Sequence, residues 1–531
     1  MRKSLPLIAV AACLIVSACH TRVTEVEPSE AFRKALDEVM LRQPDEKLRV
    51  RPDDLASKPR KVVLRLSLED CLELSAARNR AILFSQLSVE LRRAQTMTAN
   101  GALDATAGAT FKYTREQEEV QSRFGGDTRD RSISGVTTYG ISGIFPFATG
   151  TTAEVTGAFV RSDTNNPFQT FEFFPETTFM VRQHLLNGFG LIPNLGPIWL
   201  AEGAERIAEF DLAATRNLTA FNVANAYWDL VASIKDVEVL QSQRKLALEA
   251  LDLANNRLNA GIGTRLDVLA QESNLAAQEV LIIKAEALVG TCTDDLLYLV
   301  HPELLTGYAM FDGYKLEVQP QTQPDDTKLG SNPITLLGEL KGALGRRPEI
   351  AAARKTVDLS GLSIEINEWG LLPTLDVEGE FAVAGFGVTS NDSFENYGDF
   401  DNLRYGVGFT FGVPIQNRRA RGALEQAVVN KRNAILAARD AETGVIIEVA
   451  AAVRLIETGR EALRAARKAQ ELASETYKAV QERQAADLAT AFEVNQAQND
   501  LTAAKRDFAK ATVDVEKAYL ALRKATGEMG R

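Results

Sequence analysis

Side chains that carry out catalysis or bind metals are few in this sequence and lie far apart along the chain. The three histidines fall in unrelated segments, at His20, His184 and His301. No Ser/His/Asp set, phosphate-binding glycine loop or cluster of metal ligands accompanies them. We interpret His184 as a structural residue at the end of a strand, and acid pairs such as Asp294-Asp295 as solvated surface. The sequence therefore predicts no catalytic site, no cofactor and no metal centre.

One of the four cysteines has a chemical context that the others lack. Basic Arg2 and Lys3 precede a short apolar segment at 5–16, and Val16-Ser17-Ala18-Cys19 follows it. This spacing resembles a bacterial lipoprotein signal. In such a signal, small residues let a peptidase cut before the cysteine, and the thiol then carries diacylglycerol, with palmitate as a typical fatty acid. The alternative is an ordinary signal peptide with a chance cysteine.

The residues after Cys19 indicate whether a lipidated chain would stay in the inner membrane or move to the outer membrane. His20 and Thr21 follow the cysteine. An aspartate there would resemble an inner-membrane retention signal, so its absence favours the outer membrane. The sequence thus predicts a signal peptide at 1–18 and a lipid on Cys19, held to the outer membrane.

The net charge and the amino-acid composition exclude several classes of protein. A net charge of -11 and a pI near 5.2 argue against a nucleic-acid binder, because no basic surplus is available to neutralise phosphates. The scarcity of cysteine excludes a disulfide scaffold; free thiols are expected at Cys71 and Cys292, although these two could also meet. No run of about 18 apolar residues follows the N-terminus, so no membrane-spanning helix is expected. A membrane role must come from a lipid or from strands.

Long proline-free tracts rich in Ala, Leu, Glu, Gln, Lys and Arg predict long helices. No proline occurs in 198–301 or in 415–531. Each tract breaks once, at Gly261-Ile262-Gly263-Thr264 and, less sharply, at Gln484-Ala485-Ala486-Asp487. Each tract is therefore predicted to form a helical hairpin. The predicted hairpins span about 198–300 and 420–527.

Each predicted hairpin has one long arm and one short arm. The outgoing arms, about Leu200–Ala260 and Gly422–Arg483, run roughly 60 residues, or ~90 Å. The return arms, Leu266–Val300 and Glu493–Ala525, have only about 35 residues, or ~50 Å. Stacking one further helix on each return arm would restore the length. Those two further helices are predicted at Ser67–Ala99 and Pro348–Trp369.

Between the helices, large apolar residues alternate with polar or small ones. In Tyr405–Val413 the apolar residues share one face, with Gly and Thr on the other. The pattern predicts a membrane β-barrel, and 17 of the 24 phenylalanines lie in 104–190 or 376–413, which fits interfacial girdles. A half-buried sheet of a soluble protein is the alternative, and so is the opposite register. The predicted lumen residues are Lys112, Asp376, Glu378 and Glu380.

Short segments along both halves of the chain resemble motifs of one protein family. In the first half they are Leu66–Leu72, Gln183–Gly190, Ala226–Leu230, Arg257–Gly261 and Leu266–Leu269. In the second half they are Arg346–Ile350, Leu372–Leu375 and Gly412–Ile415. No single motif is specific, but their doubled order resembles the TolC family of outer-membrane efflux proteins over nearly the whole mature chain.

The resemblance implies a mainly α-helical chain with a membrane β-barrel part, built from a duplicated unit of helix, strands and long helical hairpin. It also implies a homotrimer, in which strands of three chains close one trans-subunit β-barrel and the helices close an α-helical barrel in the periplasm. The expected segments are a signal peptide at 1–18, a lipidated tether at 19–64, a first repeat at 65–301 with strands at about 104–186, an equatorial connector at 302–345, and a second repeat at 346–531 with strands at about 374–415.

The implied function is that of an outer-membrane channel subunit of a tripartite efflux pump, lipid-anchored and extending into the periplasm. Its helical tips would meet a periplasmic adaptor (membrane fusion) protein that links it to an inner-membrane transporter. A duct for type I protein secretion and a structural periplasmic spacer lipoprotein are the alternatives. The predicted adaptor-contact residues are Arg257, Gly261, Asp267, Arg483 and Asp487. The predicted pore gate is Glu493, which would otherwise face outward and pair with Arg or Lys.

The sequence departs from the family pattern in three places. A strand-turn-strand segment within 139–163 resembles an extra hairpin beyond the usual two strands of the first repeat. The second tip lacks the glycine of the first and carries Asp487 in its place. Glu493 is followed by Gln496, where a second carboxylate is frequent. The last departure puts the strength of gating at this tip in doubt.

Overall fold

The computed structural model describes residues 61–121, 127–144, 149–164, 172–261, 263–302, 315–324, 334–400, 402–486 and 488–529. The chain divides into two units. The first comprises the segments up to Glu90, Phe210–Glu349 and Glu442–Arg531, and the second comprises Leu91–Glu209 and Ile350–Ala441. The predicted signal peptide and nearly all of the predicted tether, with Cys19, lie outside the described residues, and so does Asp487.

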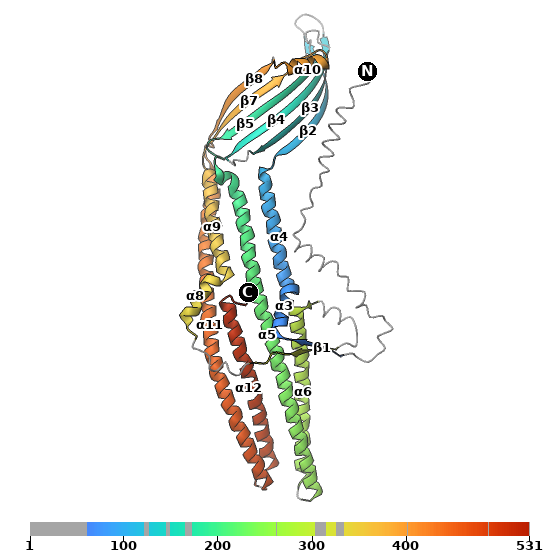
Figure 1. Cartoon of the computed structure of the whole chain (residues 1–531), viewed down its shortest axis with the longest axis vertical. Helices are drawn as coiled ribbons and strands as arrows, with labels where there is room; N and C mark the ends of the chain where they lie inside the picture. Colours follow the sequence, from blue (N-terminus) through green and yellow to red (C-terminus); the bar gives the residue numbers. More distant parts are fainter. Residues whose placement is uncertain are drawn as a thin grey trace, which may run out of the picture. The chain divides into compact units, whose positions relative to one another are not determined.

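The first unit is built mainly from long helices (Figure 1). The helical elements that contribute to it are α3 (Leu68–Arg78), α4 (Arg80–Asn100), α5 (Leu191–Asn259), α6 (Arg265–Val300), α8 (Leu336–Arg346), α11 (Arg418–Ala485) and α12 (Ala491–Ala525). Two short strands, β1 (Lys61–Leu66) and β6 (Lys315–Pro320), pair in parallel from Lys61 opposite Lys315 to Leu66 opposite Pro320.

The core of this unit forms where α3, α5, α6 and α12 meet the β1–β6 pair. Tyr227 is fully buried, and its ring lies edge-on to Trp228 with centroids 5.7 Å apart. The Tyr227 hydroxyl donates to the Leu66 carbonyl at 3.3 Å and accepts from the Thr322 amide at 2.9 Å. One side chain of α5 thus satisfies backbone groups at the ends of both strands.

The second unit contains a six-stranded antiparallel sheet and the helical segments that connect its strands. Its strands are β2 (Thr106–Gln121), β3 (Asp127–Ile144), β4 (Thr151–Thr164), β5 (Phe173–His184), β7 (Thr374–Ala384) and β8 (Leu403–Gly412), in the order β2-β3-β4-β5-β7-β8 (Figure 1). A short 3-10 turn, η3 (Gly101–Leu103), precedes β2, α9 (Pro348–Trp369) leads into β7, and α10 (Ser390–Gly398) connects β7 to β8.

Three helix boundaries differ from the sequence prediction. The helix expected at Ser67–Ala99 is two helices, because Asn79 takes an extended conformation; its side chain donates to the Leu299 carbonyl at 2.7 Å and accepts from the Ala81 amide at 2.9 Å. The outgoing arms begin earlier than predicted, at Leu191 and Arg418. In α5 this start places Pro197 inside the helix, where it removes one backbone donor and its ring crowds the carbonyl four residues earlier. Helices α8 and α10 and the β1–β6 pair were not predicted.

Candidate functional site

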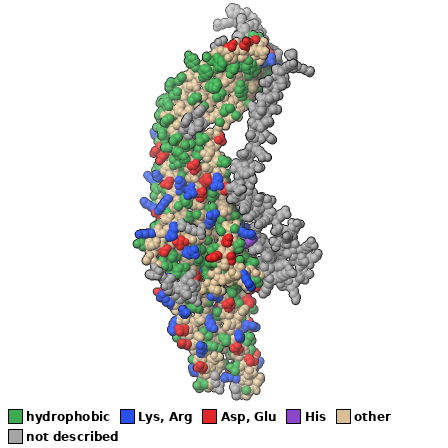
Figure 2. Space-filling model, viewed as in Figure 1, with side chains coloured by type: hydrophobic (Ala, Val, Ile, Leu, Met, Phe, Trp, Pro, Cys, Tyr) green, Lys and Arg blue, Asp and Glu red, His purple; other side chains and the backbone are tan. Residues whose placement is uncertain are grey.

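The six-stranded sheet has one face of exposed apolar side chains. Residues directly opposite one another in the ladder share a face, and Ile141, Val155, Phe179, Phe381 and Tyr405 form one continuous row across β3, β4, β5, β7 and β8. Tyr405 is 83% exposed, and the rest of this row is also exposed. Figure 2 shows hydrophobic side chains gathered over the strands. A surface of this kind needs an apolar environment or a partner.

The opposite face is polar, and it holds all four residues predicted to line a lumen. The register aligns Glu380 with Met180 and Gly406, and Lys112 with Val136. Alternation then puts Asp376, Glu378, Glu380 and Lys112 on this polar face. It is also the face of Arg182 and Arg404, which were not predicted.

Most charges on the polar face are arranged in cross-strand pairs. Arg182 pairs with Glu378, and Arg404 bridges Glu176 at 2.6 Å and Glu380 at 2.9 Å. His184 Nδ1 lies 2.6 Å from Asp376 Oδ1. Opposite charges directly across a ladder stabilise it modestly, so these carboxylates help to fix the register as well as making the face acidic.

The polar face carries an acidic surplus. Among its described side chains, six carboxylates stand against three permanently basic groups. The carboxylates are Glu116, Glu154, Glu176, Asp376, Glu378 and Glu380, and the basic groups are Lys112, Arg182 and Arg404. Arg182 and Arg404 would have been found by extending the alternation of 376–380 across the pairing strands, but the pairing itself is not readable from local sequence.

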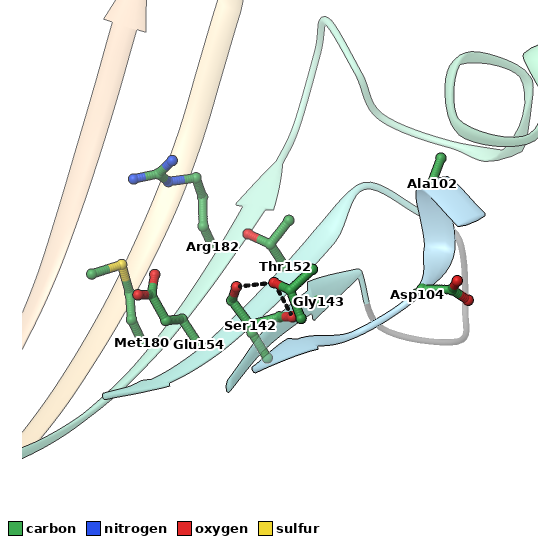
Figure 3. Close-up of a pocket in the computed structure, with 10 residues that line it drawn as sticks. Ala102, Asp104, Ser142, Gly143, Thr152, Glu154, Met180 and Arg182 are labelled. Atoms are coloured by element: carbon green, nitrogen blue, oxygen red, sulfur yellow. Dashed lines mark hydrogen bonds between the residues drawn. The ribbon is translucent and has the colours of Figure 1, made fainter. Parts of the chain in front are cut away.

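A shallow recess of about 250 Å³ lies on the polar face where β2 to β5 begin or end (Figure 3). Glu154 and Met180 lie side by side in it, and Ser142 is joined by its side chain to Thr106 at 3.0 Å. The recess is open and has no cluster of convergent ligands. It is a solvent-exposed part of the sheet surface and lacks the enclosed shape of a binding site for one small molecule.

Helix α10 covers the end of the apolar face. The Phe394 ring stacks on Phe159 with centroids 5.5 Å apart, and the Tyr397 hydroxyl donates to Thr177 Oγ1 at 2.7 Å. Phe159 and Thr177 both belong to the apolar face by register. The helix therefore leaves the polar face of β4, β5 and β7 uncovered.

The tip of the first helical hairpin is closed by Gly261 and Asp267. Gly261 has a positive φ of 76°, and its amide bonds the Leu258 carbonyl at 3.0 Å, so it ends α5 as a C-terminal cap. The Asp267 carboxylate accepts from the Thr264 amide at 3.0 Å and from its hydroxyl at 2.6 Å, which forms a capping box at the start of α6. These hydrogen bonds lower the pKa of the Asp267 carboxyl below its ordinary value, and nearby Arg257 lowers it further.

The sign of this shift sets the pH range over which the cap acts. Because the pKa of Asp267 is lower in the folded chain, the stabilisation is fully present above the ordinary value of 3.8. It is lost only as the pH falls through the lowered value. At neutral pH the cap is therefore intact.

The tip of the second hairpin repeats the same arrangement with Glu493. The Thr490 amide donates to Glu493 Oε2 at 3.0 Å, and the Glu493 amide donates to Thr490 Oγ1 at 3.3 Å. The Arg483 side chain donates to the Leu488 carbonyl at 3.1 Å and so closes the turn. Among the described residues, Glu493 thus bonds its own helix N-terminus and neither Arg nor Lys, an arrangement not anticipated from the sequence.

The two tips are joined by Arg257. Its Nη2 donates to the Gln484 carbonyl at 3.3 Å, and a groove of about 210 Å³ runs between the hairpins past Asp267, Thr490 and Asn495. The structure thus brings Arg257, Asp267 and the second tip together. Gly261 and Arg483 lie at the two separate turns.

Buried amides continue from the tips into the hairpins. Gln278 Nε2 reaches Asn499 Oδ1 across α6 and α12 at 3.4 Å. Oε1 of Gln271 and Nε2 of Gln498, both buried, have no hydrogen-bond partner in the described part of the chain. Such groups cost free energy when they remain unpaired, so these amides lower the stability of the packing between the hairpins near the tips.

The two described cysteines are free thiols, as expected. Cys71 is buried, and burial raises its pKa to about 12, with the neighbouring Asp70 charge adding to the effect. Burial also raises the pKa of Cys292. In the ranges that the structure describes, no three His, Cys, Asp or Glu side chains come together to hold a metal ion.

None of the described helices combines the length and the apolar character needed to cross a membrane.

Comparison with known proteins assigns the family. Residues 197–292 and 340–528 match the outer membrane efflux protein family. The chain belongs to this family. The recognition made from the motifs in both halves is confirmed, and the matched segments cover most of the first long hairpin and all of the second.

Individual relatives agree with this assignment. The chain is 33% identical to the fusaric acid resistance protein FusA of Burkholderia cepacia over 191 residues, 36% of this chain and 32% of FusA. It therefore spans about a third of FusA's length in that match. It is 24% identical to the outer membrane efflux protein BepC of Brucella suis over 387 residues, 71% of this chain and 77% of BepC.

A solved structure shows the same fold. The outer membrane protein VceC of Vibrio cholerae superposes with a TM-score of 0.62 at 16% identity, over 87% of this chain and 96% of VceC. Helical hairpins joined to an antiparallel sheet, the predicted fold, are thus confirmed. Together these comparisons support the predicted function, the outer-membrane channel component of an efflux pump.

The capping role of Glu493 gives a prediction that separates it from a charge gate. Glu493→Gln keeps a side chain that can accept from the Thr490 amide. Glu493→Ala removes this half of the capping box, leaves Thr490 as the N-cap, and should cost about 0.5–1.5 kcal/mol of helix stability. We expect conductance of the assembled channel, and its block by multivalent cations, to change in the alanine variant and to stay near wild type in the glutamine variant. If both variants change equally, the charge and not the cap sets the gate.

Proposed function

We propose that three copies of this chain form a passive exit channel through the outer membrane and the periplasm. The observation that carries the proposal is the six-stranded sheet with an exposed apolar face and a polar acidic face. Among the described residues, its edge strands β2 and β8 each pair on one side only. An open, exposed edge strand invites pairing with another chain. Pairing β8 of one copy with β2 of the next closes a barrel with its apolar face toward lipid and its polar face toward the lumen.

In this proposal the helical unit forms the periplasmic part of the channel. The hairpin tips, with Arg257, Gly261, Asp267, Arg483 and Asp487, meet a periplasmic adaptor protein, which links the channel to an inner-membrane transporter. Exposed tip residues such as Leu266, which is 75% exposed, and Phe492, also 75% exposed, support a protein contact there. The chain itself carries out no catalysis, since its role is to conduct what the transporter delivers.

We also propose that Cys19 carries a lipid that holds the N-terminus at the outer membrane. The support is the spacing Val16-Ser17-Ala18-Cys19 after a basic and then apolar segment. A lipid and a barrel in one chain give two anchors, and two anchors hold far better than a single acyl chain.

Conductance of the purified trimer in a planar bilayer tests the channel. We expect ion conduction with a preference for cations, because the polar face carries more carboxylates than basic groups. Glu154→Gln should reduce that preference, since Glu154 lies on the polar face. Glu395→Gln, the same change on the exposed α10, should not. A chain that remains monomeric, or a trimer that conducts no ions, contradicts the proposal.

A further inference from the structure

Among the described residues, the two halves of the duplicated chain contain unequal numbers of sheet strands. The second half has two, β7 and β8, between α9 and α11. The first half has four, β2 to β5, between α4 and α5. The additional pair, β3–β4, does not extend the sheet at an edge, because it lies between β2 and β5 and is hydrogen-bonded to both.

The β3–β4 hairpin follows the same face rule as the rest of the sheet. On the apolar face, Tyr139 lies directly over Gly157, where an added Cβ would clash with the ring. Ile141 and Val155 continue this exposed apolar face. The hairpin therefore has the outer surface of a membrane wall, not of a soluble appendage.

The polar face of the hairpin is lined by small side chains. Glu154 is the one charged residue among the described polar-face side chains of β3 and β4. The others are Ser134, Val136, Thr138, Gly140, Ser142, Thr152, Thr156, Ala158, Val160 and Ser162. These side chains are short, so they would leave the space next to the polar face of the hairpin open.

We propose that the β3–β4 hairpin widens the outer-membrane pore, so that this channel releases bulky, weakly charged solutes. The inference rests on the threefold channel proposed above, which with six strands per chain has eighteen strands. With strands about 4.8 Å apart and tilted by about 40°, such a barrel is ~36 Å across between backbones. Two strands per half would give twelve strands and ~24 Å.

The difference in barrel diameter affects which solutes can pass, because side chains take up the outer part of the lumen. Allowing roughly 5 Å of side chain on each wall leaves a free radius of about 13 Å with the hairpin and about 7 Å without it. The wider pore passes solutes of roughly twice the radius. Among its described side chains, the hydroxyl-rich added wall offers these solutes hydrogen bonds and carries no charge apart from Glu154.

Size-graded labelling from outside the cell tests this width. Gly408 lies on the polar face in β8, and a Cβ there meets no atom within 4 Å, so Gly408→Cys places a thiol in the lumen without distortion. Val407→Cys, its neighbour on the apolar face, is the matched control that water-soluble reagents should not label. The probes are maleimide-terminated polyethylene glycols of increasing hydrodynamic radius.

We expect Gly408→Cys to react with polymers up to a radius of about 13 Å. Removing 122–171, with a short turn joining β2 to β5, should lower the cut-off about two-fold. A cut-off near 7 Å in the full-length chain overturns the widening, and this decides the question even if the shortened chain does not fold. Failure of the smallest maleimide to label Gly408→Cys in an assembled trimer contradicts the open channel itself.

Discussion

Replacing Arg347 by methionine is expected to lower the free energy of unfolding by about 2–4 kcal/mol, a large loss for one side chain. The Arg347 side chain is only 6% exposed. Its Nη1 donates to the Lys524 carbonyl at 3.0 Å, at the C-terminal end of α12, and its Nη2 lies 3.1 Å from Glu448 Oε2. Methionine keeps most of the packed volume but removes the guanidinium from Glu448. It also removes one donor from the Lys524 carbonyl, which still accepts from Asn217 Nδ2 and from the Gly527 amide, each at 3.0 Å.

The size of this loss follows from how buried the partners are. Breaking an enclosed ion pair costs about 3–5 kcal/mol, but the Glu349 and Glu448 side chains are 38% and 44% exposed and can be rehydrated. The Ala525 carbonyl, 3.5 Å from Arg347 Nη1, belongs to a buried residue and is rehydrated less easily. Arg347→Lys should fall between wild type and methionine, since an ammonium lacks the planar fork.

The adjacent arginine is the control. Arg346 forms an exposed pair with Glu528, and its side chain is 33% exposed. Arg346→Met should therefore cost less than about 1 kcal/mol. The detergent-solubilised protein can be unfolded in urea and followed by its helical circular dichroism signal. The urea concentration at the unfolding midpoint should fall in the order wild type, Arg346→Met, Arg347→Lys, Arg347→Met. Equal midpoints for the two methionine variants would show that Arg347 is not the residue that ties α12 to this region.

The helices were readable from the sequence because their signals are local. Proline-free tracts and one break in each defined both hairpins, and the return arms end at Val300 and Ala525 as predicted. The break at Asn79 was missed because it depends on a hydrogen bond to the distant Leu299 carbonyl. Nothing in residues 67–99 alone distinguishes an asparagine inside a helix from one that interrupts it.

The faces of the sheet could be predicted from local sequence, but its strand order could not. Alternation identified which side chains share a face, but strand order depends on pairing between distant segments. The position of β3–β4 between β2 and β5, and the bridging of Glu176 and Glu380 by Arg404, are therefore visible only in the structure. Helix α10 was missed because its nine residues lie within a segment too short and too polar to show helical periodicity.

The role of Glu493 shows how a motif can have a local meaning that a family comparison conceals. Thr490 and Glu493 stand three residues apart, as do Thr264 and Asp267, and each pair closes a capping box. This spacing was present in the sequence and would have predicted two helix starts. The interpretation of Glu493 as a gate drew instead on its place in the family pattern.

Replacing Cys19 by alanine is expected to abolish fatty-acid incorporation completely while leaving the chain in the outer membrane. Each buried methylene of an acyl chain contributes about 0.8 kcal/mol to membrane binding, so losing the lipid removes one strong anchor. The exposed apolar face of the sheet provides a second anchor in the proposed barrel. Labelled palmitate should therefore enter the wild type and not Cys19→Ala, and both should fractionate with outer membrane.

Two properties of the chain make this result specific. Cys13→Ala is a matched control in the same N-terminal segment, and it should label like the wild type, because Cys13 precedes the predicted cleavage point. The other cysteines are poor substitutes for acylation: Cys71 is buried with a pKa raised to about 12, and the pKa of Cys292 is also raised, so neither supplies much thiolate. Undiminished labelling of Cys19→Ala would contradict the lipid anchor. Loss of both the label and the membrane fraction would instead show that the lipid, and not the sheet, holds the chain in the membrane.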